Sequence, residues 1–555
     1  MKKSDKYVLL ALLLGLIHPL HAAPLPASAT VLEQRLASRF DDDRTGTCVL
    51  AALIDKGQVL RARSCAGTRS DGPPDMGAAF EIGSVSKTMT AALVADLIER
   101  GLWSLDDPIA KHLPAGSPLP RQGEREILLR DLLTHSAGLP ALPPGMRSPN
   151  PTDPYASLSE AQLLASLADV KLTQPIGSQS AYSNFGMMLV SLAVARSQGA
   201  EGSEGGNLEA ALRERLFQPL GMSGAFVAQP ALAPPATGHL PTGQVTEAWH
   251  SALNLAGFGM VKASLADLER YARGELGEGP AALVATLRRT QQPLAHGYAM
   301  NWLLRSVQGH EIVMHEGGTG GFSSLVALEP ATHRAVVLLA DTALSDLGGL
   351  GDLGLSLLGL DLPVQAPRRA MAAPAVLRHS LAGEYDLGGL RMRIWEEAES
   401  GKMKAQAQGQ ASFELLYDSR GDFYPTFFSA LLHPVPQTDA AEPLERFTWH
   451  QGGGMVEARR LGLVEAVPSI SNPAWHDWAG EYQIAPQFSL RVFEREARLM
   501  LQGSGQPAIV AEVSGTDRIE VKAAGVVLEF ERDASGRVVA AVLRQNGQIL
   551  RGPRR

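Results

Sequence analysis

The sequence is poor in cysteine and aromatic residues and has no block of like charge. Only 2 of its 555 residues are cysteine, and 6% are aromatic. Acidic and basic residues are mixed along the chain and leave a formal net charge of −8 at pH 7. Nucleic-acid-binding chains usually carry clustered basic residues. We therefore expect no nucleic-acid partner.

Long apolar runs are also absent beyond the N-terminus. The run at 7–17 follows three lysines and is too short to cross a bilayer, and Ala22 and Ala23 offer small-residue cleavage sites. No cysteine lies near them, which excludes a lipoprotein signal. We expect residues 1–22 to be a signal peptide. The mature protein would then be secreted, into the periplasm, with no membrane attachment; an uncleaved anchor is the alternative.

The most informative stretch is Phe-Glu-Ile-Gly-Ser-Val-Ser-Lys-Thr at 80–88. Gly83 permits a sharp turn, and apolar residues then recur at helical spacing until Gly101. Ser84 should lie on the first turn of a buried helix, with Lys87 on the same face. The free N–H groups there stabilise an oxyanion beside Ser84. With burial, the positive end of the helix lowers the pKa of Lys87, so that its amine can act as a base.

A serine and a neutral lysine one turn apart form a nucleophile–base pair without histidine. The alternative is a capping serine beside a solvated lysine, because both residue types are common on helices. Two further motifs favour the catalytic interpretation.

The second motif is Tyr182-Ser183-Asn184, just before a helical run at 185–195. In a loop, residues two apart can face one cleft, so the phenol could relay a proton and the amide could hold a substrate carbonyl. Between the first two motifs, a short helix with a glycine stop is predicted over 127–139. We expect His135 in it to make structural hydrogen bonds.

The third motif is His-Glu-Gly-Gly-Thr-Gly-Gly-Phe-Ser-Ser at 315–324. Apolar stretches at 312–314, 325–328 and 335–340 predict consecutive antiparallel strands around it. Glycine in a strand allows another backbone to approach, which suits an edge strand that binds a substrate amide. No Gly-Lys-Ser/Thr ending follows, which excludes a phosphate-binding loop.

The two cysteines lie in a predicted hairpin. Two strands flank a two-residue loop, Lys56-Gly57, so the numbers of paired residues sum to 113. Cys48 then faces Cys65 at a non-hydrogen-bonded position, where side chains approach most closely. In an oxidising compartment we expect a disulfide. The alternative is two reduced thiols, since a change in turn length would shift the register.

The three motifs, separated by about 95 and 130 residues, together resemble the serine β-lactamase / penicillin-binding-protein superfamily. The pattern is closest to class C β-lactamases, D-alanyl-D-alanine carboxypeptidases and D-aminopeptidases. Segments 133–139, 216–222 and 297–302 support the resemblance, which covers about residues 30–360. It implies an α/β domain in which helices flank an antiparallel sheet beside an all-helical lobe, with the site between them.

The resemblance also implies roles for individual residues. Ser84 would be the nucleophile, Lys87 its base and Tyr182 a proton relay. Asn184 would bind substrate.

On the third motif, Gly317 would bind substrate, and the backbone N–H groups of Ser84 and Gly318 would form the oxyanion hole. No metal or organic cofactor is implied.

Two residues depart from the β-lactamase pattern. His315 stands where those enzymes have the lysine of Lys-Thr-Gly, as in carboxypeptidases and D-aminopeptidases, and carries less positive charge at neutral pH. Glu316 replaces the threonine. Its carboxylate would repel a β-lactam carboxylate and attract a substrate amine if it faces the cleft; alternatively it points to solvent. Both changes argue against efficient β-lactam hydrolysis.

The C-terminal part is repetitive. Leu-Ala-Gly-Glu-Tyr at 381–385 recurs as Trp-Ala-Gly-Glu-Tyr at 478–482, among short alternating runs typical of strands. We expect two small antiparallel, lipocalin-like β-barrels, a layout that resembles three-domain D-aminopeptidases. The predicted divisions are a hydrolase domain at 23–365, a linker at 366–379, and barrels at 380–468 and 469–555.

The sequence thus predicts an exported serine hydrolase that forms an acyl-enzyme at Ser84. Its preferred substrates would be small peptides with D-amino acids, as for D-aminopeptidases or DD-peptidases. The alternatives are a class C-like β-lactamase that acts on β-lactams, a short-chain esterase, and a penicillin-binding sensor that acylates without turnover. The sequence predicts no oligomeric state.

Overall fold

The computed structural model describes residues 24–555 except 68–70, 151, 198–206, 229–232, 398–399, 438–441, 452–453, 462–472, 486–487, 496–497, 504–508, 522–525 and 546–547. The expected signal peptide and the expected boundary between the two barrels lie outside the described residues. The chain forms two compact units, residues 1–461 and 462–555.

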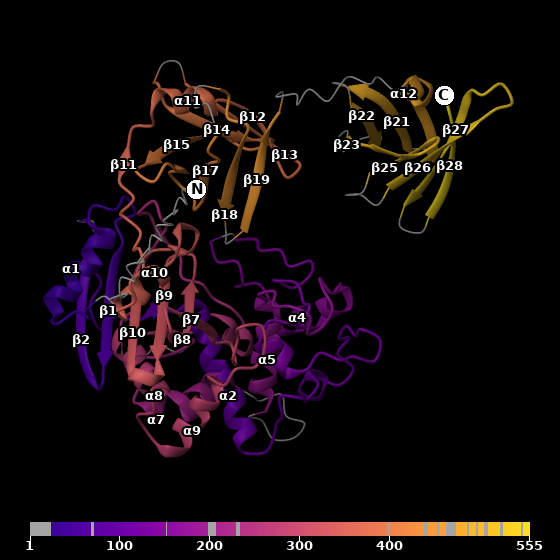
Figure 1. The fold of residues 1–555 in the computed structure, drawn as a ribbon. Helices are drawn as coiled ribbons and strands as arrows, with labels where there is room; N and C mark the ends of the chain where they lie inside the picture. The colour runs from indigo at the N-terminus through magenta and orange to yellow at the C-terminus, as the bar shows by residue number, and fades with distance from the viewer. Residues whose placement is uncertain are drawn as a thin grey trace, which may run out of the picture. The chain divides into compact units, whose positions relative to one another are not determined.

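A six-stranded antiparallel sheet forms the centre of the first unit (Figure 1). Its strand order is β2-β1-β10-β9-β8-β7. The three consecutive strands expected around the third motif are present as β8, β9 and β10. The strands are β1 (Cys48–Asp55), β2 (Gln58–Cys65), β7 (Leu303–Val307), β8 (His310–Gly318), β9 (Ser323–Glu329) and β10 (Arg334–Ala340).

Helices cover both faces of this sheet because its strands alternate between two apolar cores. In β10, Val336 and Leu338 pack with α1 and α10, whereas Val337 and Leu339 belong to the core that contains the other helices. The helices of the two cores are α1 (Ala29–Phe40) and α10 (Gly351–Leu357) on one side, and α2 (Ser86–Glu99), α5 (Asn184–Arg196), α8 (Leu265–Glu275) and α9 (Ala281–Thr290) on the other.

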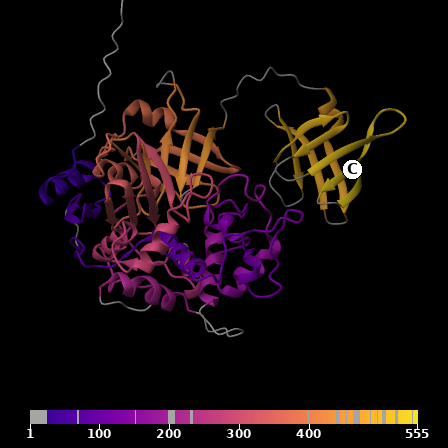
Figure 2. The same cartoon turned by 60° about the horizontal axis from the view of Figure 1, so that its bottom comes forward.

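The expected helical lobe lies beside the sheet (Figures 1 and 2). Its centre is α5, which is buried from Phe185 to Ala195, as the all-round apolar sequence requires. The helix expected over 127–139 is shorter, because the backbone turns to positive φ at His135 and Gly138. The remaining α-helices here are α3 (Leu129–Leu133), α4 (Glu160–Ser166) and α6 (Leu208–Leu212), whereas α7 (Gln218–Leu220) lies beside α8.

A closed antiparallel barrel follows in the first unit. Strands β12 to β19 pair in sequence, β12 also pairs with β19, and β15 pairs with β16 as well as β14. The stretch 366–379, expected to be a linker, contains β11 (Ala370–Met371), which pairs with β15, and the start of α11 (Ala375–Leu381). The barrel strands are β12 (Gly383–Leu387), β13 (Leu390–Glu396), β14 (Met403–Ala407), β15 (Phe413–Asp418), β16 (Phe423–Pro425), β17 (Leu431–Pro434), β18 (Arg446–Gln451) and β19 (Gly454–Arg460).

Buried ion pairs join this barrel to the hydrolase sheet. Arg44 Nε, before β1, lies 2.8 Å from the Asp418 carboxylate at the end of β15. Arg368 pairs with the same carboxylate at 3.2 Å and also with Asp422. Removal of one partner would leave a buried charge uncompensated, so these contacts tie the barrel to the hydrolase domain.

The second unit is built from strands β20 to β28, preceded by α12 (Pro473–Trp478). They form a four-stranded and a five-stranded antiparallel sheet, and a bridge between Tyr482 and Arg554 links the first strand to the end of the last. The strands are β20 (Gly480–Ala485), β21 (Phe488–Arg495), β22 (Arg498–Gly503), β23 (Ile509–Val510), β24 (Glu512–Gly515), β25 (Arg518–Val521), β26 (Val526–Arg532), β27 (Val538–Gln545) and β28 (Gln548–Pro553).

The internal repeat has a structural basis. Tyr385 donates a hydrogen bond of 2.8 Å to the carbonyl of Leu381, and Tyr482 donates one of 2.6 Å to the carbonyl of Trp478. In each copy an arginine from the end of the barrel binds the carbonyl of the alanine in the repeated motif: Arg460 to Ala382, and Arg554 to Ala479.

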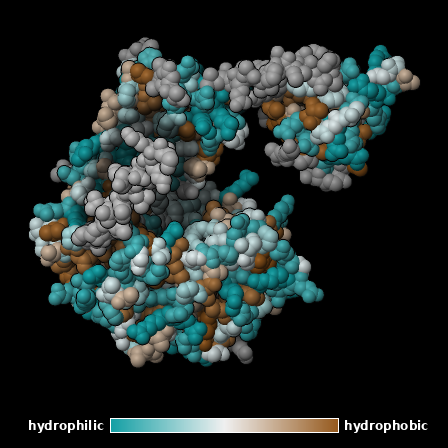
Figure 3. Space-filling model, in the orientation of Figure 1, coloured by the Kyte–Doolittle hydropathy of each residue, from teal (hydrophilic) through white to brown (hydrophobic). Residues whose placement is uncertain are grey.

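Among the described residues, no helix is long and apolar enough to span a membrane. On the face shown in Figure 3, hydrophobic residues are scattered among hydrophilic ones.

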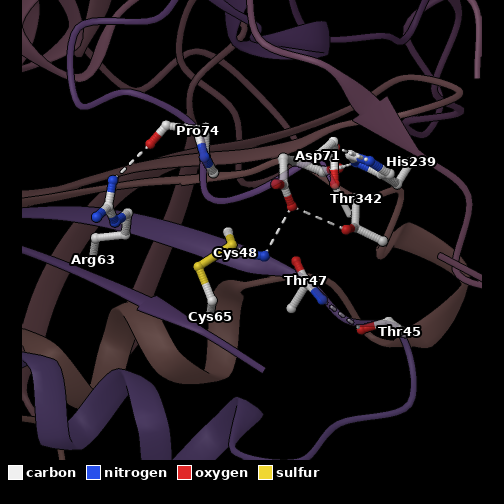
Figure 4. Close-up of a disulfide and its surroundings, with 10 residues drawn as sticks. Thr45, Thr47, Cys48, Arg63, Cys65, Asp71, Pro74, His239 and Thr342 are labelled. Carbon is white, nitrogen blue, oxygen red and sulfur yellow. Dashed lines mark hydrogen bonds and ion pairs between the residues drawn. A yellow bond between two sulfur atoms is a disulfide. The ribbon is translucent and has the colours of Figure 1, made fainter. Parts of the chain in front are cut away.

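The hairpin β1–β2 has the predicted register, with Cys48 opposite Cys65. A disulfide joins the two cysteines, whose Cα atoms are 4.0 Å apart (Figure 4). The backbone N–H of Cys48 also donates to the carboxylate of Asp341, which follows β10. The covalent bond and this hydrogen bond both fix the edge of the sheet.

Reduction of the disulfide should destabilise the first unit. The bond closes a loop with a sequence separation of 17, and a loop of this length contributes about 3 kcal/mol through the entropy of the unfolded chain. Chemical denaturation with and without reductant should show this loss in the transition of residues 1–461. The Cys48→Ala/Cys65→Ala variant is the control, since reductant should not change its midpoint; equal midpoints for the wild type would contradict the expectation.

Candidate active site

The turn that carries Ser84 links a short strand to α2. Strand β3 (Phe80–Glu81) pairs with β6 (Lys262–Ala263), and Gly83 follows with φ +50°. Residues Gly83–Val85 form a single 3₁₀ turn that leads into α2. Ser84 therefore lies half-buried immediately before the helix N-terminus, close to the position expected from the sequence.

Lys87 is fully buried beside Ser84. Its exposed fraction is 0%, and Nζ lies 2.8 Å from Ser84 Oγ. The amine also donates to the carbonyl of Phe258 at 2.5 Å. Burial lowers the pKa of Lys87 well below its usual value, because the charged form loses its hydration. A neutral amine at hydrogen-bond distance can accept the proton of the Ser84 hydroxyl.

Tyr182 lies on the other side of this pair. Lys87 Nζ lies 4.8 Å from the centre of the Tyr182 ring, and the Tyr182 hydroxyl interacts with Ser84. Although 41% of the residue is exposed, burial of the hydroxyl end raises the pKa of Tyr182. The phenol therefore remains protonated at neutral pH and can donate a proton.

His135 supports the Tyr182 ring from behind. The two rings are 4.3 Å apart, and His135 Nδ1 accepts a hydrogen bond from the backbone N–H of Ser183. The pKa of His135 is well below its usual value, chiefly because the ring is buried. The imidazole is therefore neutral, with its proton on Nε2. This contact agrees with the structural role expected for His135.

Strand β8 forms the opposite wall. His315 is 7% exposed, and its ring centre is 6.5 Å from that of Tyr182. Its Nδ1 lies 2.6 Å from the backbone carbonyl of Glu316. Burial lowers the pKa of His315 to about 4, so the residue carries no charge at neutral pH.

Glu316 lies outside this cluster. Its carboxylate accepts a hydrogen bond of 2.9 Å from the backbone N–H of Leu350, at the start of α10. Adjacent strand residues point to opposite faces, so Glu316 faces α10 when His315 faces Lys87. Glu316 is exposed and lies on the opposite face of β8 from His315; that it binds substrate stays a prediction.

Two glycines allow β8 to touch the Ser84 turn. A Cβ on Gly317 would lie 2.0 Å from the carbonyl oxygen of Ile82, and a Cβ on Gly83 would lie 2.5 Å from the backbone nitrogen of Gly318. Only residues without side chains permit this approach. The contact places the Gly318 N–H against the backbone beside Ser84.

Asn184 begins α5 at the edge of the cluster. Its Nδ2 lies 3.5 Å from the Tyr155 hydroxyl, and its Oδ1 is buried with no hydrogen-bond partner among the described residues. Tyr155 packs edge-on against Phe258, the residue whose carbonyl binds Lys87.

Three of these neighbours were not identified as site residues from the sequence. Phe258 acts through its backbone carbonyl and Tyr155 is an isolated tyrosine, so no motif marks either one. For His135 the sequence predicts structural hydrogen bonds, but its packing against Tyr182 has no sequence signal.

The Gly317→Ala substitution should disrupt the site without removing a functional group. The new methyl group would push β8 away from Ile82, and displacements of about 1 Å at a reacting centre can cost roughly 10²-fold in rate. We expect a loss of this size in kcat/KM for any substrate that acylates Ser84. Gly67→Ala is the matched control, because a Cβ there would meet no atom within 4 Å; equal activity of the two variants would refute the packing argument.

Comparison with known proteins places this geometry in a family. The chain shows 28% identity over 225 residues to the D-alanyl-D-alanine-carboxypeptidase/endopeptidase AmpH of Escherichia coli (strain K12), covering 40% of this chain and 56% of that protein. It shows 28% identity over 337 residues to penicillin-binding protein 4 of Amycolatopsis lactamdurans, covering 56% and 85%. The chain therefore spans little more than half the length of AmpH.

Among solved structures, the crystal structure of SurE matches 78% of this chain and 98% of its own, with 22% identity and a TM-score of 0.47. The family model described as Beta-lactamase matches residues 34–354. That match covers more than half of the 555 residues and includes Ser84, Tyr182 and His315. The chain belongs to the Beta-lactamase family.

Proposed function

We propose that the protein is an exported serine hydrolase that cleaves amide bonds in small peptides containing D-amino acids, through an acyl-enzyme at Ser84. The observation that carries the proposal is the 2.8 Å contact between Lys87 Nζ and Ser84 Oγ at a fully buried position. Burial supplies the neutral base that a serine nucleophile needs.

Acylation begins with transfer of the Ser84 hydroxyl proton to Lys87 as Oγ attacks the substrate carbonyl. The carbonyl oxygen becomes an oxyanion, which accepts hydrogen bonds from the backbone N–H groups of Ser84 and Gly318. The contact between Gly83 and Gly318 supports this assignment. Gly317 keeps the strand close enough for a substrate backbone to lie along it.

Collapse of the tetrahedral intermediate requires a proton on the leaving nitrogen. Tyr182 supplies it, because the phenol stays protonated and lies between Ser84 and the cleft. Tyr182 regains its proton from the Lys87 ammonium. Water then attacks the acyl-enzyme by the reverse sequence of proton transfers and releases the acid.

The substrate class rests on relatives and on the wall of the site. AmpH is named a D-alanyl-D-alanine-carboxypeptidase/endopeptidase, and the uncharged His315 suits an amide better than a β-lactam carboxylate. Asn184 binds the carbonyl or amide of the acyl group. A class C-like β-lactamase and a short-chain esterase use the same nucleophile and remain the alternatives, with a sensor that acylates without turnover as a third.

Export rests on the expected signal peptide at residues 1–22. The disulfide between Cys48 and Cys65 supports it, because such bonds persist in oxidising compartments. We place the mature protein in the periplasm, free of the membrane.

Ser84→Ala should abolish hydrolysis of D-alanine p-nitroanilide. Loss of the nucleophile in serine hydrolases costs on the order of 10⁴- to 10⁶-fold in kcat, and release of p-nitroaniline measures it directly. The L-isomer, a chromogenic cephalosporin and a p-nitrophenyl ester serve as comparison substrates.

The pattern of turnover separates the alternatives. Turnover of the D-amide above the L-amide supports the proposal. Ser84-dependent cleavage of only the cephalosporin or only the ester would refute the proposed substrate class but would support Ser84 as the nucleophile. A stable adduct at Ser84 without product would identify a sensor.

A further inference from the structure

One residue, His135, holds the backbone on both sides of Tyr182. The carbonyl of His135 accepts a hydrogen bond of 2.8 Å from the N–H of Ala181, and its Nδ1 accepts one of 3.3 Å from the N–H of Ser183. Ala181 and Ser183 are the two neighbours of Tyr182 in the chain. The backbone of Tyr182 is therefore fixed relative to His135 from both sides.

The imidazole also packs against the ring of Tyr182. The two ring centres are 4.3 Å apart and their planes meet at 39°, while Tyr298 contacts the same imidazole edge-on at 5.5 Å. His135 is 2% exposed, so this contact is made from within the protein. Packing between aromatic rings favours particular orientations. His135 thus fixes the direction of the Tyr182 side chain as well as its backbone.

The backbone conformation of His135 is uncommon for a residue with a side chain. Its φ is +55°, in the left-handed region that histidine, asparagine and aspartate enter more often than other residues with a Cβ. Such a conformation costs free energy and persists only where the surrounding contacts determine it. The two hydrogen bonds to the neighbours of Tyr182 and the packing on its ring are contacts of this kind.

The loop that leads to Tyr182 is also anchored by contacts that do not involve the imidazole. The carbonyl of Ser136 accepts a hydrogen bond of 2.7 Å from the N–H of Gly177, and the carbonyl of Gly138 accepts one of 2.8 Å from the N–H of Thr173. These bonds join backbone groups only. Replacement of the imidazole should therefore leave the loop attached and change chiefly the position of the phenol.

We propose that His135 is a positioning residue that holds the Tyr182 phenol where it protonates the leaving nitrogen, and so makes the enzyme effective on amides as well as on activated esters. This inference rests on the proposed function and deepens it. The C–N bond of an amide breaks as the phenol O–H gives its proton to the nitrogen, and the phenol regains a proton from the Lys87 ammonium, which received it from Ser84. A p-nitrophenolate leaves as a stable anion and needs no such proton.

The test compares D-alanine p-nitroanilide with D-alanine p-nitrophenyl ester. Both give the same D-alanyl enzyme, and kcat/KM reports only the steps up to release of the first product. In His135→Asn, asparagine keeps a side-chain acceptor and tolerates positive φ but lacks the ring. We expect kcat/KM for the amide to fall by about 10- to 100-fold, as for a small displacement of a reacting group, and kcat/KM for the ester to change little.

A double-mutant cycle with Tyr182→Phe shows whether His135 acts through the phenol. Without the phenol there is no proton donor to position, so His135→Asn should lower amide turnover no further in the Tyr182→Phe background. His112→Asn is the matched control. The ring of His112 stacks on Trp103, with centres 4.0 Å apart, and its Nε2 binds Asp107. Neither partner belongs to the site, so the ratio of amide to ester turnover should keep its wild-type value.

Equal losses on the amide and the ester would show that His135 only supports the fold and would overturn the inference. A further loss of amide turnover in the double variant would also overturn it, because His135 would then act independently of the phenol. If His135→Asn does not fold, His135→Gln takes its place in both comparisons. Failure of the proposed function is a different result, since the wild type would then show no Ser84-dependent cleavage of the D-amide.

Discussion

The burial of one amine organises the site. Lys87 has an exposed fraction of 0%, and its surroundings offer a serine hydroxyl and a backbone carbonyl. Desolvation favours the neutral amine. Helix α2 must therefore be enclosed on all sides, and α5 and α9 pack against it within the core beside the six-stranded sheet. In the proposed mechanism, burial in the apolar core lowers the pKa of Lys87 so that its amine can act as the base.

A second constraint is the close approach of two backbone segments. The turn before α2 and the end of β8 meet only because Gly83 and Gly317 lack side chains. The same contact brings the wall with His315 to the proposed nucleophile. Adjacent side chains of β8 point to opposite faces of the sheet. His315 therefore faces Lys87, whereas the charged side chain of Glu316 faces α10. The site is consequently rich in hydrogen-bonding groups and poor in charge.

Much of this arrangement could be predicted from the sequence. Local sequence patterns predicted the hairpin with its register, helices α2 and α5 and the consecutive strands around the third motif. They also predicted the two copies of the motif at 381–385 and 478–482. Linear spacing was also enough to bring Ser84 and Lys87 together, because residues three apart share a helix face.

Contacts that form only in three dimensions could not be predicted from the sequence. The amides at the start of α10, about 35 residues after Glu316, bind its carboxylate, and no spacing within the third motif indicates this contact. The low pKa of His315 comes from burial of its ring, which no local sequence pattern encodes. The stretch expected to be a linker instead packs against β15, through pairing and the buried charge of Arg368.

The most direct test of the account is the pH dependence of acylation. With a p-nitrophenyl ester, which has no titrating amine, the rate of Ser84 acylation should rise with pH through a single ionisation and reach its plateau well below 10.5, the usual pKa of lysine. A neutral Lys87 base requires this, because activity appears as pH rises through its lowered pKa. An acylation rate that continues to rise up to pH 10.5 would show that Lys87 is a charged residue at neutral pH and would contradict the account.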